Sequence, residues 1–224
     1  MPEALGGALD LKLHVGGSLA APRVEAELDL GELRWGERRG AGANGRVRID
    51  GSHVSALFAM HWHDGGDLSL ELDLPARLSL SPVALDWRDA EPLRIALSVD
   101  ESDLSEMFSW ADALSRTAGT PTADELRAAA GIDLVDGQVR LDLLVEGTPV
   151  DPRMRVLFVG QPLDVGRWKD GTLLFEGNAR GDQSTFRMQL VDAQDRLQAM
   201  LDARLPFGVA RAIRQPEPAA WIRR

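Results

Sequence analysis

The sequence predicts a mainly β protein, an extended antiparallel sheet of repeated strand units with a short helical interlude. Three observations predict this fold class. A strand-and-turn unit occurs twice, apolar residues alternate with polar ones along most of the chain, and turn signals separate the alternating runs. Together these features are typical of a sheet that has one apolar and one solvated face.

The repeated unit begins at Gly7 and begins again at Gly137, 130 positions later. Each copy consists of a strand, a Gly-Ser or Gly-Thr turn, a Pro-Arg pair and a second strand. Repetition of such a unit is typical of an extended array rather than of a compact enzyme. Aligned without a gap, the identical positions are Gly7 and Gly137, Leu11 and Leu141, Leu13 and Leu143, Val15 and Val145, Gly17 and Gly147, Pro22 and Pro152, and Arg23 and Arg153.

Alternation with a period of two marks the strands, because successive side chains of a strand point to opposite faces. The longest alternating run extends from Leu68 to Leu80 and contains Pro75. Proline cannot donate to a sheet ladder, so Pro75 predicts an edge position or a bend. The apolar positions that we expect to line one face are Leu9, Leu11, Leu13, Val15, Leu68, Leu70, Leu72, Leu74, Leu78, Leu80, Val139, Leu141, Leu143 and Val145.

Five short segments carry turn signals between the runs. Asn44-Gly45 and residues 64–67 predict hairpin turns, because Asn, Asp and Gly tolerate positive φ. Asp50-Gly51, Asp136-Gly137 and Asp170-Gly171 are further candidates for turns.

One stretch departs from the alternation. Apolar residues over 102–116 follow helical spacing, and Ser102 or Asp103 can cap the start of that helix. Residues 122–125 match a capping box and open a second short helix that ends before Gly131. The predicted organisation is a β-repeat segment over 1–101, a helical interlude over 102–131 and a second β-repeat segment over 132–224.

The composition excludes several classes of function. A net charge of −10 argues against nucleic-acid binding and against broad adsorption on anionic lipid. The absence of cysteine excludes disulfides, thiolate zinc sites and cysteine nucleophiles. No apolar run reaches the length of a membrane span, and residues 1–20 lack a signal-peptide pattern. We therefore expect a fragment of a longer repeat array, with any membrane anchor outside it.

Residues that could carry chemistry are few. His61 and His63 share the side opposite the apolar residues, and a zinc site needs more convergent ligands than the chain offers there. Most carboxylates occupy the solvated positions of alternating strands, and no nucleophile elbow is present. The six tryptophans can stack on sugars, but they are scattered. We expect no catalytic residue, no metal site and no cofactor.

The leucine-rich face allows two interpretations. It can pack against a second sheet as a dry core, or it can line an open trough made by a curled sheet. Uncovered apolar surface of that extent requires a ligand in a soluble protein. An acyl chain satisfies this requirement, because each buried CH₂ group contributes about 0.8 kcal/mol.

The repeat also carries a resemblance to a known family. Gly7-x-Leu-x-Leu-x-Leu-x-Val-x-Gly17-Ser, followed by Pro22-Arg-Val, resembles the recurring unit of TamB (translocation and assembly module subunit), one of the AsmA-like envelope proteins of Gram-negative bacteria. The second copy matches the pattern through Gly147-Thr148 and Pro152. Residues 92–107 resemble the strand and short helical turn that precede a unit in that family.

The resemblance implies a sheet folded lengthwise into a U-shaped groove that presents an apolar lining to phospholipid acyl chains. It implies a periplasmic location, with an inner-membrane anchor in the full-length protein, and transport of phospholipid between the inner and outer membranes. The family is also linked to outer-membrane protein assembly with a barrel partner. A module for that assembly, with a closed apolar core, is the alternative function.

Overall fold

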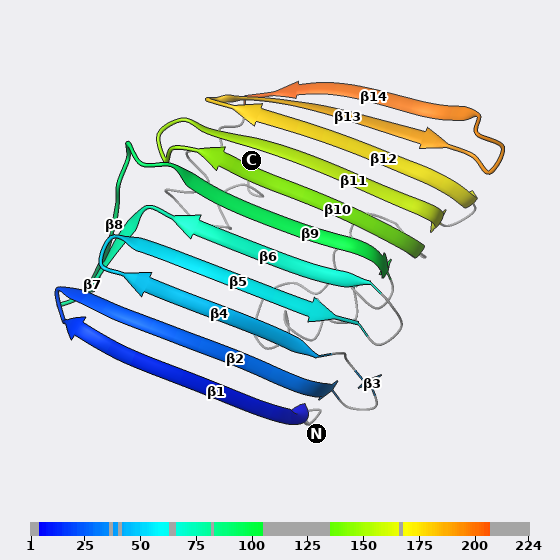
Figure 1. The fold of residues 1–224 in the computed structure, drawn as a ribbon. Helices are drawn as coiled ribbons and strands as arrows, with labels where there is room; N and C mark the ends of the chain where they lie inside the picture. The colour runs from blue at the N-terminus through cyan, green and yellow to red at the C-terminus, as the bar shows by residue number, and fades with distance from the viewer. Residues whose placement is uncertain are drawn as a thin grey trace.

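The structure is a computed structural model, and the described residues form a mainly β fold (Figure 1). A large antiparallel sheet contains eleven strands in one path and is not closed. A separate hairpin forms a second, two-stranded sheet. The residues that the structure describes are 5–35, 38–39, 42–62, 66–81, 83–104, 135–165 and 168–206.

Most neighbours in the large sheet are also neighbours in sequence. The order along the sheet is β1-β2-β4-β5-β6-β9-β10-β11-β12-β13-β14, and the short β3 pairs with β2. Figure 1 shows β1 along one edge of this open sheet and β14 along the other. The strands are β1 (Leu5–Ser18), β2 (Ala21–Trp35), β3 (Arg38–Arg39), β4 (Ala43–Asp50), β5 (His53–His61), β6 (Asp67–Leu74), β7 (Ala76–Leu80), β8 (Val83–Trp87), β9 (Leu93–Asp103), β10 (Val135–Gly147), β11 (Pro152–Val165), β12 (Trp168–Arg180), β13 (Gln183–Val191) and β14 (Leu197–Leu205).

The two copies of the repeat form two hairpins with the same register. In β1–β2, Leu11 lies opposite Leu28, and Gly17 lies opposite Pro22. In β10–β11, the positions 130 residues later pair in the same way, from Leu141 opposite Phe158 to Gly147 opposite Pro152. Both hairpins also have a register shift beside the first glycine of the copy, at Gly7 and at Gly137. The predicted repeat is therefore confirmed as a structural unit.

The turns of the two hairpins use the same hydrogen bond. The Ser18 hydroxyl accepts from the amide of Ala21 at 3.2 Å, and the Thr148 hydroxyl accepts from the amide of Asp151 at 3.2 Å. A serine or threonine hydroxyl in this role stabilises a turn locally. The Gly-Ser and Gly-Thr pairs of the sequence thus have a structural reason in both copies.

Pro75 divides the longest alternating run between two sheets. β6 ends at Leu74 in the large sheet, and β7 begins at Ala76 in the small one. The amide of Leu80 in β7 donates to the carbonyl of Leu19 in the β1–β2 turn at 2.7 Å. The β7–β8 hairpin therefore lies at the end of the large sheet where the β1–β2 turn is found (Figure 1). The bend is one of the two outcomes that the sequence predicted for Pro75, and the residue is buried there.

The predicted turns have mixed outcomes. Asp50-Gly51 does connect β4 to β5, with Gly51 at φ 52°. The predictions at Asn44-Gly45, Asp136-Gly137 and Asp170-Gly171 are wrong, because these pairs lie inside β4, β10 and β12. Positive φ at Gly137 and at Asp170 accompanies irregular pairing within a strand rather than a reversal of the chain. Residues 63–65 of the remaining turn lie outside the described residues.

The predicted helical interlude falls largely on residues that the structure does not describe. Its first two residues, Ser102 and Asp103, belong to the end of β9, so the start of the interlude at 102 is corrected. Ser102 is buried in this strand, and its hydroxyl donates to the carbonyl of Asp100 at 3.2 Å. Leu104, which belongs to the first predicted helix, is helical. Residues 105–134 lie outside the described residues, and the rest of the first predicted helix and the whole of the second fall there.

Candidate functional site on the apolar face

One face of the large sheet is apolar from β1 to β14. Cross-strand pairing links side chains into rows that run perpendicular to the strands, and three such rows cross all eleven strands. We call this surface the apolar face. Apart from Ser184, every position in the three rows is an apolar residue or a glycine. The rows are Leu9-Leu30-Ala43-Met60-Leu68-Val99-Leu141-Phe158-Phe175-Met188-Leu201, Leu11-Leu28-Gly45-Phe58-Leu70-Leu97-Leu143-Val156-Gly177-Phe186-Ala203 and Leu13-Ala26-Val47-Ala56-Leu72-Ile95-Val145-Met154-Ala179-Ser184-Leu205.

The apolar face extends over a large part of the sheet. Ten spacings between neighbouring strands give a length of about 48 Å, and the rows cover about 20 Å along each strand. The rows therefore span on the order of 1,000 Å² of sheet surface, of which the parts on β1 and β14 are the most exposed. No charged residue interrupts the rows, so the face is continuous for an apolar ligand.

Exposure to solvent varies along the apolar face. On β1, Leu9, Leu11, Leu13 and Val15 are 56–66 % exposed. In the middle strands, Val99 is 1 % exposed and Val139 on β10 is 2 % exposed. On β14, Leu201 and Leu205 are exposed again. The face is therefore open to solvent at both ends and partly buried at its middle strands, where Leu70, Leu97 and Leu143 have intermediate exposure.

Buried residues in the middle of the face form two clusters. One contains Leu93, Val145 and Ala179, which come from β9, β10 and β12. The other contains Leu104, Val139 and Leu163, against which Phe158, Trp168 and Leu173 pack. Each cluster includes one residue of the second copy of the repeat, Val145 in the first and Val139 in the second.

Glycines on the apolar face make room for aromatic rings. A Cβ atom on Gly45 would lie 3.3 Å from the Phe58 ring, and one on Gly177 would lie 3.0 Å from the Phe186 ring. Phe186 in turn stacks on Phe175, with ring centroids 5.7 Å apart. Sequence reasoning missed these positions as part of the lining. The sequence did contain a signal for them, because Gly45 and Gly177 each lie two residues away from apolar residues of the same strand and therefore share their face.

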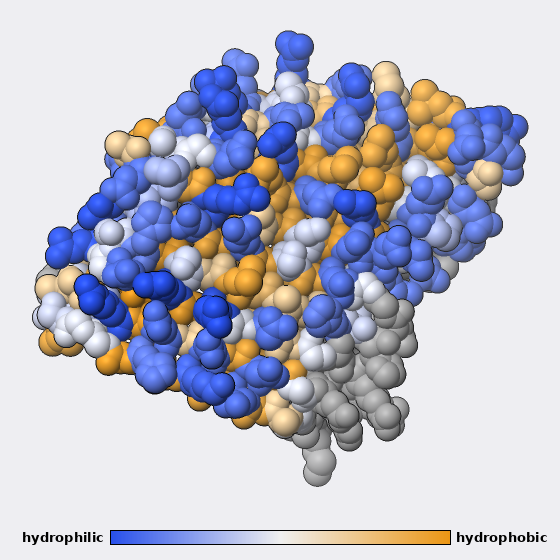
Figure 2. Space-filling model, viewed as in Figure 1, coloured by the Kyte–Doolittle hydropathy of each residue, from blue (hydrophilic) through white to orange (hydrophobic). Residues whose placement is uncertain are grey.

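The opposite face of the large sheet carries the charged residues, and we call it the polar face. Ion pairs join neighbouring strands across it, such as Arg46 to Glu27 at 2.7 Å and Arg187 to Asp202 at 2.9 Å. Figure 2 shows this face, with hydrophilic side chains spread over the strands and hydrophobic residues visible between them. The pKa of Arg187 is raised, mainly because its side chain donates a hydrogen bond to Asp202.

A shallow hollow on the polar face does not provide a comparable site. Its volume is about 670 Å³. Apolar side chains such as Leu57 and Leu144 line it together with charged ones such as Glu71, Arg94 and Arg155. Because these charged groups already pair across strands, the hollow presents mostly satisfied polar groups to a ligand.

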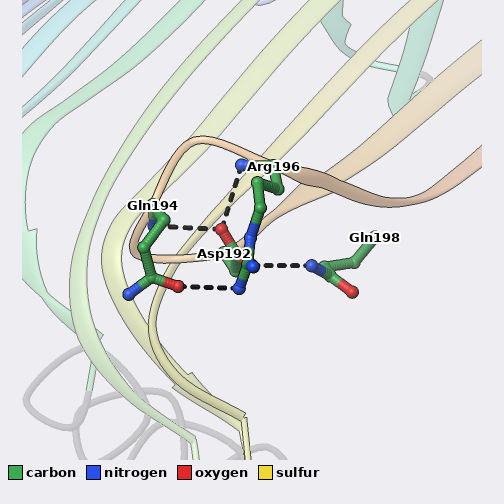
Figure 3. A network of polar contacts seen from close by, with 4 residues as sticks. All are labelled: Asp192, Gln194, Arg196 and Gln198. Atoms are coloured by element: carbon green, nitrogen blue, oxygen red, sulfur yellow. Dashed lines mark hydrogen bonds and ion pairs between the residues drawn. The ribbon is translucent and has the colours of Figure 1, made fainter.

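The β13–β14 turn holds a compact polar network (Figure 3). The Asp192 carboxylate accepts from the backbone amides of Gln194 and Arg196, both at 2.9 Å, and from the Gln198 amide at 2.7 Å. The Arg196 guanidinium donates to the same carboxylate at 2.8 Å. The Arg196 backbone bond, followed by its side-chain bond, lowers the pKa of Asp192 to about 2. This network fixes the turn that leads into the edge strand β14.

The histidines, which were the remaining candidates for a metal site, do not form a cluster of ligands in the described residues. His61 on β5 is exposed, and its Nδ1 lies 2.6 Å from an Asp67 oxygen on β6. His63 lies outside the described residues. Within the described ranges, no group of three or more His, Asp and Glu side chains could hold a metal ion. The His61–Asp67 pair instead links two strands on the polar face.

The structure places the predicted lining residues in two groups. Twelve of them lie on the apolar face of the large sheet, in strands β1, β6 and β10. Leu78 and Leu80 lie on β7 of the small sheet, opposite Leu85 and Val83. These two residues are therefore separated from the rows by the bend at Pro75. The twelve are Leu9, Leu11, Leu13, Val15, Leu68, Leu70, Leu72, Leu74, Val139, Leu141, Leu143 and Val145.

Comparison with known proteins adds no relative. No protein-family model, no curated protein and no solved structure matches the chain. Among the described residues, no helix has the length and apolar character needed to cross a membrane.

Proposed function

We propose that this chain is a non-enzymatic, lipid-carrying segment of a TamB/AsmA-like periplasmic bridge. In this role the sheet curls into a groove, and the apolar face receives phospholipid acyl chains on their way between inner and outer membranes. The full-length protein is anchored in the inner membrane, and membrane contact occurs through parts outside this chain. The single observation that carries the proposal is the three uncharged rows that cross all eleven strands.

The chemistry of the rows suits an acyl chain. Acyl chains offer no hydrogen bonds to read, and the rows offer no charged group and only one hydroxyl, that of Ser184. Transfer of each CH₂ from water to an apolar contact contributes about 0.8 kcal/mol. Exposed leucines at both ends of the face, on β1 and on β14, leave room for a ligand to enter and leave.

A pair of substitutions at the β14 end tests the proposal. Leu201 and Met200 are neighbours, both are 55 % exposed, and they project from opposite faces of the sheet. The full chain is incubated with vesicles that contain a fluorescent phospholipid, and the lipid bound to the re-isolated protein is measured. Leu201→Arg lowers the bound lipid severalfold, because it places a charge on the apolar face. Met200→Arg, the matched control, leaves it unchanged.

A second pair tests the middle of the sheet. Leu70 lies in the middle row, and Ser69 precedes it on the polar face of β6. Leu70→Arg reduces lipid binding while the circular dichroism spectrum stays that of a β protein, and Ser69→Arg has no effect on either.

Absence of phospholipid from the wild-type protein after extraction and mass spectrometry would refute the proposal.

The alternative function is a structural module that assists outer-membrane protein assembly, with an outer-membrane barrel protein as its partner and a closed apolar core. The burial of Val99 and Val139 favours it, because these residues already lack contact with solvent. In that case Leu70→Arg unfolds the protein, since an unpaired charge in a core costs several kcal/mol. Melting of this variant, compared with Ser69→Arg, therefore separates the two functions.

A further inference from the structure

The 130-residue offset between the two copies extends beyond the two hairpins. The turn after β4 begins with Asp50-Gly51, and the turn after β12 begins with Arg180-Gly181, again 130 positions later. Both glycines have positive φ, 52° at Gly51 and 62° at Gly181. β4 pairs with β2 and β12 pairs with β11 in the same register, so side chains at equivalent positions can be compared directly.

Four side chains on the polar face form a neutral group in the first copy. Arg23 on β2 lies opposite Asp50 on β4. Two residues further along β2, Glu25 lies opposite Arg48. The Asp50 carboxylate is 3.6 Å from each arginine, and Arg48 is also 3.6 Å from Glu25. We call these four positions the charge square, which two acids and two bases balance in this copy.

The charge square of the second copy is basic. Its four positions hold Arg153, Arg155, Asn178 and Arg180. Arg153 lies directly opposite Arg180, and like charges in this arrangement destabilise a strand pair. The square therefore changes from no net charge in the first copy to three positive charges in the second.

Neighbouring acids neutralise only part of this charge. A Glu146 oxygen lies 3.4 Å from Arg155, and an Asp151 oxygen lies 3.8 Å from Arg180. Arg153 is exposed, and within the described part of the chain it forms no ion pair and no side-chain hydrogen bond. The Arg153 guanidinium is thus available to an anion from outside the chain.

We propose that the charge square of the second copy binds a phosphate group between Arg153 and Arg180. The Cβ atoms of directly opposite residues lie about 4.5–5.5 Å apart, so both guanidinium groups can reach one ligand. A guanidinium donates paired N–H bonds to phosphate, and the tetrahedral oxygens can accept from two strands at once. The Asn178 side chain adds an uncharged donor, and Arg155 adds positive charge nearby. The bound group replaces repulsion between two arginines by the attraction of both to one anion.

The first copy shows that an anion fits this position. There the Asp50 carboxylate lies 3.6 Å from Arg23 and from Arg48, so the fold already holds a negative group between two arginines. In the second copy Arg180 takes the place of that carboxylate, and a phosphate supplies the negative charge from outside. The same square thus serves as an internal ion-pair group in one copy and as a binding site in the other.

Space for the rest of a phosphate ester lies beside the square. The hollow of about 670 Å³ on the polar face extends to Arg155 and Asn178. Leu144 and Leu157 also line it, and Glu176 in the same lining repels a second anionic group. The site therefore suits an ester whose substituent is uncharged.

Arg180→Asp tests the proposal by giving the second copy the residue of the first. In phosphate-free buffer the variant is expected to have a higher urea midpoint than the wild type, because the introduced carboxylate pairs with Arg153. Inorganic phosphate raises the midpoint of the wild type and leaves that of the variant unchanged, since a ligand stabilises the folded state that binds it. Equal stabilisation of the wild type by sodium chloride at the same ionic strength would overturn the proposal, because screening alone would then explain it.

A matched pair of alanine substitutions locates the site. Arg153→Ala is expected to weaken the binding of inorganic phosphate about tenfold or more in an NMR titration of the full chain, because it removes a charged donor. Arg23→Ala, at the equivalent position of the first copy, leaves the affinity unchanged. The same loss in both variants, or a loss in neither, would overturn the proposal.

The phosphate can belong to a soluble ester or to a lipid headgroup, and vesicles separate the two sources. Co-sedimentation of the wild type, but not of Arg180→Asp, with phosphatidylglycerol vesicles assigns the group to a lipid headgroup. Phosphatidylcholine vesicles, whose headgroup has no net charge, control for binding through the apolar face. Binding of inorganic phosphate without this difference in co-sedimentation assigns the site to a soluble phosphate ester, and the absence of both would overturn the proposal.

Discussion

The two copies of the repeat have the same backbone and different surroundings. In both, a register shift lies beside the first glycine, a hydroxyl binds the turn, and a glycine lies opposite a proline. Yet Leu9 in the first copy is 63 % exposed, whereas its equivalent Val139 in the second is 2 % exposed. Local sequence therefore determines the hairpin, and the position of that hairpin in the sheet determines what its apolar side chains contact.

The number of neighbouring strands accounts for part of this difference. β10 has a strand on each side, and the buried clusters of the core lie over it. β1 has a strand on one side only, so its leucines lose solvent contact only toward β2. Equivalent apolar positions of a repeat can thus serve as core in one copy and as an open apolar surface in the other.

Introducing a carboxylate at the equivalent apolar positions gives the largest contrast. Val139→Asp is expected to lower the free energy of unfolding by about 3 kcal/mol or more, because it buries an unpaired charge. Leu9→Asp is expected to cost less than about 1 kcal/mol, since its side chain stays in solvent. Urea denaturation followed by circular dichroism measures both. Equal losses in the two variants would show that exposure does not distinguish the copies.

The turn glycines give the opposite test, in which the copies are expected to agree. Gly17 and Gly147 have φ of 82° and 116°, and an added Cβ would lie 2.5 Å and 2.6 Å from a backbone carbonyl oxygen. Substitution by alanine is expected to cost about 1–3 kcal/mol in each copy, because the strain is local. Gly16→Ala is the control, since nothing lies within 4 Å of its added Cβ. A large difference between the two copies in denaturation midpoint would contradict a shared turn.

The sequence was sufficient to predict the strands, but it did not predict the structural roles of Gly45 and Gly137. Alternation predicted the apolar face of β1, β6 and β10, and the bend at Pro75, because these depend on neighbouring residues. Gly45 and Gly137 were predicted in turns, and both lie inside strands. Their roles depend on distant residues. Gly45 makes room for Phe58 on the next strand, and Gly137 allows the bulge opposite Leu163. The local pattern of residue types does not show which residue of a neighbouring strand will lie opposite each glycine.

The burial of residues on the apolar face could not be predicted from the local sequence either. Whether Val139 is core depends on the pairing of β10 with β9, and residues 104–134 separate these two strands in the sequence. The same alternating pattern therefore left both a dry core and an open trough possible. In the structure, Val99, Val139 and Val145 of the middle strands are buried, whereas the apolar side chains of the two edge strands are exposed, and no single copy of the repeat could indicate this difference.

Acid is expected to loosen the β14 edge before the middle of the sheet. The pKa of Asp192 is lowered to about 2, chiefly by the backbone amide and side chain of Arg196. The charged carboxylate is therefore favoured in the folded turn, and its contribution is complete above the ordinary pKa of 3.8. It is lost as the pH falls from about 4 to about 2. Amide exchange in β14 should rise over this window relative to exchange in β10.

Asp192→Asn isolates this effect from other carboxylates. The variant is expected to show fast exchange in β14 at neutral pH and to lose the part of the acid dependence that Asp192 contributes. Identical pH profiles for the wild type and the variant would indicate that the turn does not control the edge. The consequence for global stability is small, because the network is local to the β13–β14 turn.

The smallest effects are expected for single ion pairs on the polar face, where the two copies have similar exposure to solvent. Glu27 in the first copy pairs with Arg46 at 2.7 Å, and Glu146 in the second pairs with Arg155 at 3.4 Å. The two glutamate side chains are similarly exposed, so solvent screens both pairs. Glu27→Gln and Glu146→Gln are each expected to cost less than about 1 kcal/mol, and less still at high salt. If Glu146→Gln cost several times more than Glu27→Gln, the middle of the sheet would differ from its edge on the polar face as well. Similar small losses would instead confine the difference in burial between the copies to the apolar side, where the neighbouring strands and the buried clusters are found.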